Sequence, residues 1–506
     1  MNYTDRTTEA EELSGMGTVG GEYVTLPLCE KRVSLESMGE YTLPDGQPEI
    51  RRVLSVTPTV LPPAKYVGAA GVELSGNVDY SALYVGADGA LYSLPLSSEY
   101  HLMIPLEHSS ELDPMGGVTV WSDLFAESVQ ARVASPRRIS LRCRLGALVR
   151  AYGRMLMEEK CIGESSAKHL FRRVARCEAL ALSSGRSDVL PLSCEFLGVG
   201  EDARVVTAEG SCTVNEIRIS SGESVTASGE VHLRLLVARE SGALETLSRS
   251  VAFSGEAELE GIDEGYDFRG TATLSELTVE VGEGGRIDCA LSVIVEVRGM
   301  KNCEKSYTED LFSTERESSC EKKSYRLPTA LRCERRNFSQ SERIARSGVS
   351  IPEGARICDA WGSVSFEDCS TVGQKYVLTG QSRYTMLCEK DGEYSACELI
   401  LPIRYETEAA EGEAESFSAE GRVISCRARA EGEVVCLDAE IAVAADFCGA
   451  QEIVAVSAAR FGEPIAERGS RMTVYYPMPN ESAWDVAKKY RIAPETVKKA
   501  SSYYYF

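Results

Sequence analysis

The sequence predicts a mainly β protein in which three tandem antiparallel β-sandwich-like repeats precede a small module of βαα(β) order. Three observations predict this fold class. A hairpin pattern occurs three times, a second alternating strand recurs at nearly the same spacing, and alternation gives way to helical periodicity after Met472. The 506 residues suffice for three or four domains of ordinary size.

The clearest hairpin pattern covers residues 224–247. After Gly229, apolar residues alternate with Glu230, His232 and Arg234. This period of two places the apolar side chains on one face of a strand and the charges on the other. Glu240-Ser241-Gly242 then provides a turn, after which the chain returns. The residues expected to be buried are Val231, Leu233, Leu235 and Val237.

The same pattern occurs after Gly76 and after Gly380, so the three glycines are 153 and 151 residues apart. A second alternating strand occurs at 139–149, 287–297 and 435–443, in blocks 148 residues apart. Two patterns that recur at one period indicate three copies of one β-domain. We expect these repeats at residues 24–155, 156–312 and 313–468.

The remaining segments between these patterns are polar or of mixed charge. Residues 1–23 contain scattered glycines and predict a flexible N-terminal arm. The stretches Arg154–Arg176 and Lys301–Arg346 interleave both signs of charge, which is typical of solvated linkers or edge strands. Within the first, Ala167–Ala181 fits either a short helix or the first strand of the second repeat.

Composition limits the classes of function. A net charge of −23 argues against nucleic acid and against an anionic membrane surface. No apolar run is long enough for a membrane span and no secretory signal is recognisable, so we expect a cytoplasmic protein without membrane insertion.

The chemistry-bearing residues do not form a catalytic pattern. There are only four histidines, and no Ser/His/Asp motif or phosphate loop is found, so we expect no enzyme and no cofactor. The 17 cysteines are scattered and odd in number. A disulfide framework and a zinc site are conceivable, but reduced thiols in strand cores fit better, and we expect no metal.

From Met472 the chain predicts a small separate module at residues 472–506. A short strand at 473–476 is followed by Pro477 and Pro479, and Asn480 or Ser482 can cap a helix. The apolar face of this helix is formed by Ala483, Val486, Ala487 and Tyr490. Pro494 is placed to open a second helix, with Val497 and Ala500 on its buried face.

This module resembles LysM. The stretch Asn480–Tyr490 (NESAWDVAKKY) is similar to the family's Gly-Asp-Ser-Leu-Trp-Asp-Ile-Ala-Lys-Arg-Tyr pattern. It departs from the family in two respects: Asn480-Glu481 replaces the leading Gly-Asp, and the chain stops at Phe506 before the expected closing strand. The glycan-binding loops are thus altered or missing, which favours protein docking over carbohydrate binding.

Three β-repeats followed by a terminal LysM-like module resemble the clostridial SipL-type spore-coat morphogenetic proteins. The resemblance implies a non-enzymatic scaffold in the mother-cell cytoplasm, at the forespore surface, that docks to the coat-basement ATPase through the LysM end. The alternative is a LysM protein that binds peptidoglycan or spore cortex.

The residues expected to contact the partner lie on the first helix of the module and just before it. Trp484 either packs within its own module or forms an exposed aromatic anchor beside two lysines. The full expected set is Asn480, Trp484, Asp485, Lys488 and Lys489.

Overall fold

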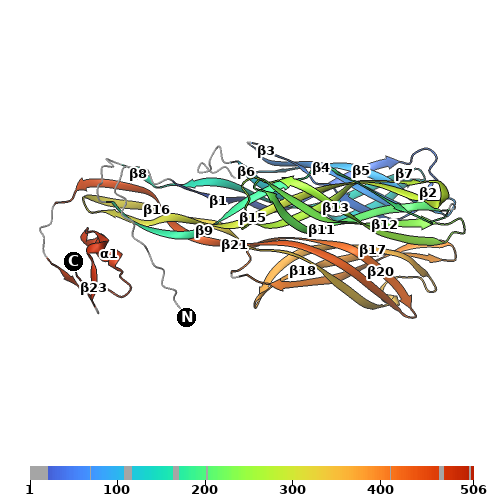
Figure 1. Ribbon diagram of the computed structural model, residues 1–506. Coiled ribbons are helices and arrows are strands. Elements are labelled where there is room, and N and C mark those ends of the chain that lie inside the picture. Colours follow the sequence, from blue (N-terminus) through green and yellow to red (C-terminus); the bar gives the residue numbers. More distant parts are fainter. Residues whose placement is uncertain are drawn as a thin grey trace.

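The computed structural model describes residues 21–68, 70–106, 117–162, 170–200, 203–410, 412–466, 472–500 and 503–505. The protein is mainly β, which confirms the predicted class, and long strands run along an elongated body (Figure 1). One α-helix occurs in the described residues, near the C-terminus. No helix among them is long and apolar enough to cross a membrane.

The first unit contains two antiparallel sheets. One has the order β1-β7-β6, and in the other β4 lies between β2 and β5, with the short β3 also paired to β4. The strands are β1 (Glu22–Thr42), β2 (Ile50–Val60), β3 (Ala64–Gly68), β4 (Gly71–Gly86), β5 (Leu91–Ile104), β6 (Val118–Ser135) and β7 (Arg138–Met157).

The second unit repeats this strand order. Its sheets are β11-β12-β13 and β10-β15-β14, with β9 also paired to β15. The short β8 (Lys160–Ile162) precedes it and pairs in parallel with β21 of the third unit. Its strands are β9 (Leu170–Arg186), β10 (Leu190–Phe196), β11 (Arg204–Ser221), β12 (Ser224–Ala238), β13 (Leu244–Glu258), β14 (Asp267–Val281) and β15 (Ile287–Ser313), with a 3-10 turn at Glu283–Gly285.

The third unit has the same order again, as β16-β21-β20 and β17-β18-β19, and one bridge between Val364 and Gly421 joins the two sheets. In each unit the first strand pairs with the last, and three central strands form a meander. The strands are β16 (Arg316–Ala345), β17 (Arg356–Val372), β18 (Lys375–Lys390), β19 (Glu393–Glu408), β20 (Ser416–Glu431) and β21 (Val434–Pro464), with a 3-10 turn at Arg346–Gly348.

Two of the three recurring glycines, Gly229 and Gly380, mark a close approach of two strands. A Cβ on Gly229 would lie 1.9 Å from the Thr213 carbonyl oxygen, and one on Gly380 would lie 1.9 Å from that of Ser365. Both glycines face a β-bulge in the neighbouring strand, where the backbone bends towards them. The predicted burial of the strand after Gly229 is confirmed, because Val231, Leu233 and Leu235 are at most 2% exposed.

The structure bears on three expectations for the connecting segments. The expected arm is too long by two residues, because Glu22 and Tyr23 already belong to β1; residues 1–20 lie outside the described residues. Of the two alternatives for Ala167–Ala181, the strand is confirmed and the helix is wrong from Leu170 onward, where β9 begins. The mixed-charge stretch Lys301–Arg346 forms the end of β15 and the 30-residue strand β16 at the edge of its sheet, so the edge-strand alternative is confirmed and the linker is wrong. Pairing along β21 satisfies the backbone of β16, which allows charged side chains to alternate outward.

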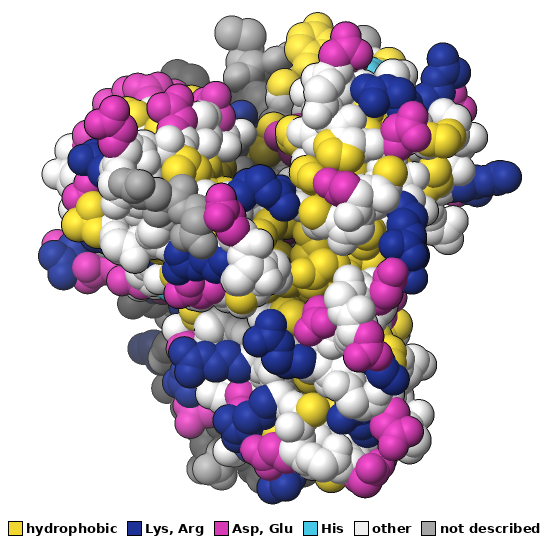
Figure 2. Space-filling model, turned by 90° about the vertical axis from the view of Figure 1, so that its right-hand side faces the viewer, with side chains coloured by type: hydrophobic (Ala, Val, Ile, Leu, Met, Phe, Trp, Pro, Cys, Tyr) yellow, Lys and Arg dark blue, Asp and Glu magenta, His cyan; other side chains and the backbone are white. Residues whose placement is uncertain are grey.

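The three units surround a shared apolar cluster at one end of the body. Leu83, Leu236 and Leu387 lie at corresponding positions of β4, β12 and β18, and all are at most 3% exposed. Viewed end-on, three lobes surround a central cleft in which hydrophobic side chains gather (Figure 2). The charged face of β12, which the alternation predicts, is covered by a neighbouring unit. Arg234 on this face pairs with Glu209 and with Asp359 of the third unit, and lies over the Trp361 ring.

A buried charge network follows along the same axis, and we call it the neck network. Its centre is Asp446 on β21, which accepts hydrogen bonds from Arg150 on β7 at 2.6 Å and from Arg269 on β14 at 2.7 Å. Arg298 on β15 pairs with Asp123 on β6 at 2.8 Å. Arg298 follows Arg150 by 148 residues, and Asp446 follows Arg298 by 148 residues. The three residues thus occupy the same position in the last strand of each unit, and all three belong to the network.

The pKa of Asp446 shows how this burial is compensated. Burial alone raises the pKa of the carboxyl, but Arg150 and Arg269 more than offset this and hold the pKa below its ordinary value. Asp446 is therefore charged, and it joins strands from all three units.

Beyond the neck, the paired ends of β1/β7, β9/β15 and β16/β21 form a narrow extension that we call the stalk (Figure 1). Its apolar core takes side chains from each pair of strands. The core residues are Val24, Met155, Met157, Cys177, Ala179, Leu327, Ile453 and Ala455. The three units therefore share buried contacts at the lobes, in the neck and in the stalk.

We expect Asp446→Asn to lower the free energy of unfolding by about 3–5 kcal/mol, because it leaves buried guanidinium groups without their anion. The measurement is the midpoint of guanidinium denaturation. Asp438→Asn is the matched control on the same strand, where a half-exposed carboxylate should contribute less than about 0.5 kcal/mol. Equal midpoints for the two variants would contradict the structural role of the network.

Candidate functional site

The C-terminal module consists of one helix and a three-stranded sheet of order β22-β24-β23. Its elements are β22 (Val474–Tyr475), α1 (Ala483–Tyr490), a 3-10 turn at Pro494–Thr496, β23 (Lys498–Ala500) and β24 (Tyr503–Tyr505). The helix begins with a reciprocal capping box between Ser482 and Asp485, and ends at Arg491 in a left-handed conformation.

Two expectations for this module are wrong. The chain does not lack a closing strand, because β24 pairs with both β22 and β23. The predicted second helix is only the 3-10 turn, and Val497 after it is already extended. Pairing with β24 gives the following residues a strand ladder, which replaces the helical hydrogen bonds that Pro494 could have started.

The helix docks onto the tip of the stalk through Trp484. The Trp484 ring is 7% exposed and packs edge-on against Phe312 of β15, with ring centroids 5.0 Å apart. Phe171 of β9 stacks on Phe312, and Ala487 belongs to the same cluster. The alternative in which Trp484 is an exposed anchor is therefore wrong. The Trp484 side chain is buried, and its contacts extend beyond its own module to β15.

Asp310 on β15 orients this contact. Its carboxylate accepts the indole N–H of Trp484 at 2.9 Å and the ammonium of Lys488 at 2.6 Å. Burial raises the pKa of Asp310, but the hydrogen bonds from Lys488 and Trp484 outweigh it, so the pKa lies below its ordinary value. A bulge between Thr308 and Asp310 shifts the register of β15, after which four consecutive residues, Asp310–Ser313, are buried.

The other residues of the expected site fall into separate roles. Asn480 is exposed and has a φ of 69°, a conformation that asparagine tolerates better than most residues. Asp485 caps the helix. Lys489 is exposed, donates to the Tyr475 hydroxyl at 2.8 Å and lies over its ring. The structure thus brings Trp484 and Lys488 together at the stalk and leaves Asn480, Asp485 and Lys489 towards solvent.

Sequence reasoning missed an apolar surface on the module, which we call the outer strip. It consists of four alternating residues with exposures between 49% and 80%: Met472, Val474, Tyr476 and Met478. Val474 belongs to the edge strand β22, so this residue of the strip lies beside backbone groups that face away from the sheet. The sequence signal that could have predicted the outer strip is the alternation of apolar residues from Met472 to Met478.

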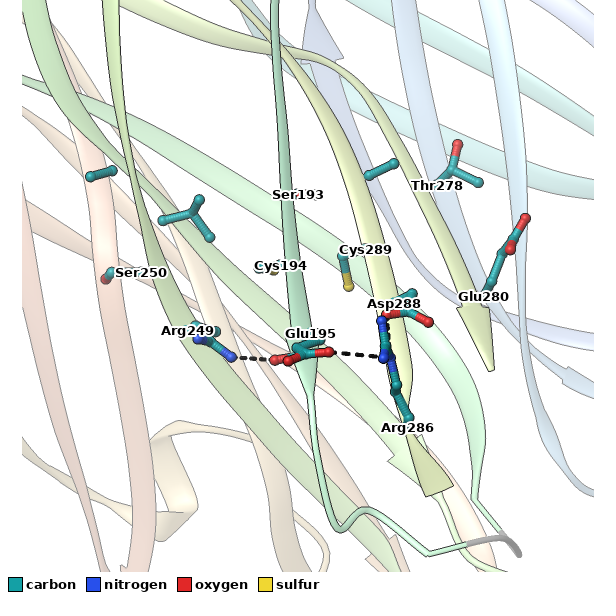
Figure 3. Close-up of a pocket in the computed structure, with 13 residues that line it drawn as sticks. Ser193, Cys194, Glu195, Arg249, Ser250, Thr278, Glu280, Arg286, Asp288 and Cys289 are labelled. Atoms are coloured by element: carbon teal, nitrogen blue, oxygen red, sulfur yellow. Dashed lines mark hydrogen bonds and ion pairs between the residues drawn. The ribbon is translucent and has the colours of Figure 1, made fainter. Parts of the chain in front are cut away.

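Another surface feature is a groove on the second unit. It has a volume of about 720 Å³ and crosses β10, β13, β14 and β15. A row of charges lines it, in which Glu195 lies between Arg249 and Arg286 (Figure 3). Within the described ranges no cluster of histidine, cysteine or carboxylate side chains is arranged to hold a metal ion.

No family model matches this chain, and no curated protein matches it.

We expect Asp310→Asn to increase hydrogen exchange of the α1 backbone amides about tenfold, because the charge-assisted bonds from Trp484 and Lys488 are weakened. Exchange followed by mass spectrometry of peptides from 483–490 measures this. Asp263→Asn is the control. It removes the ion pair between Asp263 and Lys301, which takes no part in the contact with α1. Unchanged exchange in the Asp310 variant would show that apolar contacts alone hold the helix.

The same contact should depend on pH. Because the folded pKa of Asp310 is lowered from 3.8, its contribution is complete above the unfolded value and is lost as the pH falls through the folded one. We expect protection of α1 to be constant from neutral pH to about pH 5 and to fall only below the ordinary aspartate range. Loss of protection near pH 6 would contradict this assignment.

Proposed function

We propose that this chain is a non-enzymatic assembly scaffold of the spore envelope. In this proposal it docks to a coat-basement ATPase at the forespore surface, in the mother-cell cytoplasm, through its C-terminal module. The carrying observation is that the module is anchored on the stalk by Trp484 while its outer strip remains exposed. An anchored module with an outward apolar surface suits attachment of a larger partner.

The body of the protein supports a scaffolding role. The strand order that recurs three times is what three copies of one domain would have, and we propose that the units are such repeats. Their shared buried contacts join lobes, neck and stalk, so a partner bound at the stalk tip would be held in a fixed orientation to the lobes. A fixed orientation is useful for ordering partners and is not needed for chemistry on a small substrate.

The module itself supports a LysM-like identity, which remains part of the proposal. A short strand, a capped helix, a turn and a closing strand follow one another, and Asn480 occupies a left-handed position where the LysM pattern has glycine. The chemistry of the exposed surface favours a protein partner. Alternating Met, Val and Tyr side chains with Lys489 nearby suit an apolar patch that carries an acidic group.

We expect the double variant Met478→Asp, Lys489→Glu to lower affinity for the purified ATPase at least tenfold, which is about 1.4 kcal/mol. Both side chains are exposed, so the fold should persist. Biolayer interferometry with the full chain measures the affinity, and localisation of a fluorescent fusion in sporulating cells provides the second readout.

Met103→Asp is the matched control, because Met103 is 45% exposed on the first unit, away from the module. Deletion of residues 472–506 should abolish forespore localisation. Normal localisation of both the deletion and the double variant would refute the docking role. Retention of the intact chain on purified peptidoglycan, lost in the deletion, would instead support the wall-binding alternative.

A further inference from the structure

Two cysteines of the second unit face each other across neighbouring strands. Cys194 on the edge strand β10 is the direct register partner of Cys289 on β15. Directly opposed residues of antiparallel strands have Cα atoms about 4.5–5.5 Å apart, which lies within the range of about 4.4–6.8 Å that a disulfide spans. Opposed side chains also point to the same face, so neither strand has to rotate to join the two sulfur atoms.

One of the two thiols, that of Cys194, is accessible from solvent. Both cysteines line the groove described above, beside the charged row of Arg249, Glu195 and Arg286 (Figure 3). Cys194 is partly exposed, whereas Cys289 is 2% exposed and belongs to the apolar core of the unit. A small charged reagent can therefore reach Cys194 first, with Cys289 directly behind it.

The two thiols also differ in acidity. Burial raises the pKa of Cys194, while a hydrogen bond with Cys289 and the nearby Arg249 partly counteract this. Burial and the neighbouring Cys194 raise the pKa of Cys289 to about 12. Since the thiolate is the nucleophile, Cys194 should react before Cys289.

We infer that Cys194 and Cys289 form a redox-sensitive thiol pair that a low-molecular-weight disulfide converts into a cross-strand disulfide. The Cys194 thiolate attacks one sulfur of the small disulfide, forms a mixed disulfide and releases one small thiolate. Cys289 loses its proton and attacks the Cys194 sulfur, which releases the second small thiolate. The protein loses two electrons and the small disulfide gains them.

The bond would reinforce a weak part of the sandwich. β10 has only seven residues and forms the edge of its sheet, so few ladder bonds hold it. A covalent link to β15 attaches this edge to the longest strand of the unit. Oxidation would therefore fix the edge of this sheet of the second unit covalently.

A second pair of neighbouring thiols provides an internal comparison. Cys388 on β18 faces Ser395, and Cys397 on β19 faces Met386, so the two cysteines are offset by two residues. Both are buried in the core of the third unit, at 0% and 6% exposure. Offset and burial together predict that this pair stays reduced under conditions that oxidise the first.

The test treats the full-length protein with oxidised glutathione at mildly alkaline pH, blocks free thiols and maps disulfides by mass spectrometry of peptides. We expect Cys194–Cys289 to be the dominant internal disulfide, with a rate that rises with pH beyond the ordinary thiol range. Hydrogen exchange at the β10 amides should slow at least tenfold after oxidation, and dithiothreitol should reverse both effects.

Cys194→Ser should abolish the bond and the change in exchange, and Cys369→Ser, in a half-buried position of β17, should alter neither. Circular dichroism checks that the variants are folded. Two results would overturn the inference. One is a Cys194–glutathione adduct that accumulates in the unmodified chain without resolving. The other is a pair that stays fully reduced while the exposed Cys161 becomes glutathionylated.

Discussion

The pairing of one buried carboxylate with guanidinium groups from two other parts of the chain holds this molecule together. Asp446 belongs to the third unit, Arg150 to the first and Arg269 to the second. A buried charge without a partner costs several kcal/mol, so each unit requires the others in order to bury its own side chain. Trp121 adds to this dependence, since its ring is flanked by Arg150 at 5.3 Å and Arg298 at 5.7 Å. The three sandwiches are therefore parts of one folded body.

The units also share apolar contacts at the lobe end and in the stalk, on the two sides of this network. Some strands therefore contribute both to the core of their own unit and to the shared stalk. A single strand such as β15 contributes Val293 and Val295 to the core of its own unit, and its far end lines the stalk with Tyr307. One part of each such strand packs in the core of its own unit, and the other part packs in the stalk that the three units share. This explains why β15, β16 and β21 have about 30 residues each. An isolated sandwich would need strands of only half that length.

The stalk tip extends this logic to the C-terminal module. Leu311 packs into the stalk, while the next residue, Phe312, contacts Trp484 of the helix. Adjacent residues of one strand thus connect the interior to the docked module, and Asp310 selects the orientation of the indole. The outer strip takes no part in this docking cluster and is exposed.

The sequence by itself determined the local structure. Alternation after Gly229 predicts the buried face of β12, and the two cap candidates Asn480 and Ser482 place the start of α1 to within a few residues. These features depend on neighbours along the chain or on a period of two, which a single sequence records. These local features are the basis on which the sequence predicts a mainly β protein.

The contacts between the units were decided only by tertiary structure. The sequence places Arg234 on a charged strand face and leaves two alternatives for Trp484, yet both side chains are enclosed by residues more than 100 positions away. The end of the module was misjudged for a related reason, since β24 becomes a strand only when β22 and β23 are beside it. Alternation shows which face of a strand is apolar, but what covers the polar face depends on which distant strands meet it. That choice is made by long-range pairing, which no local pattern encodes.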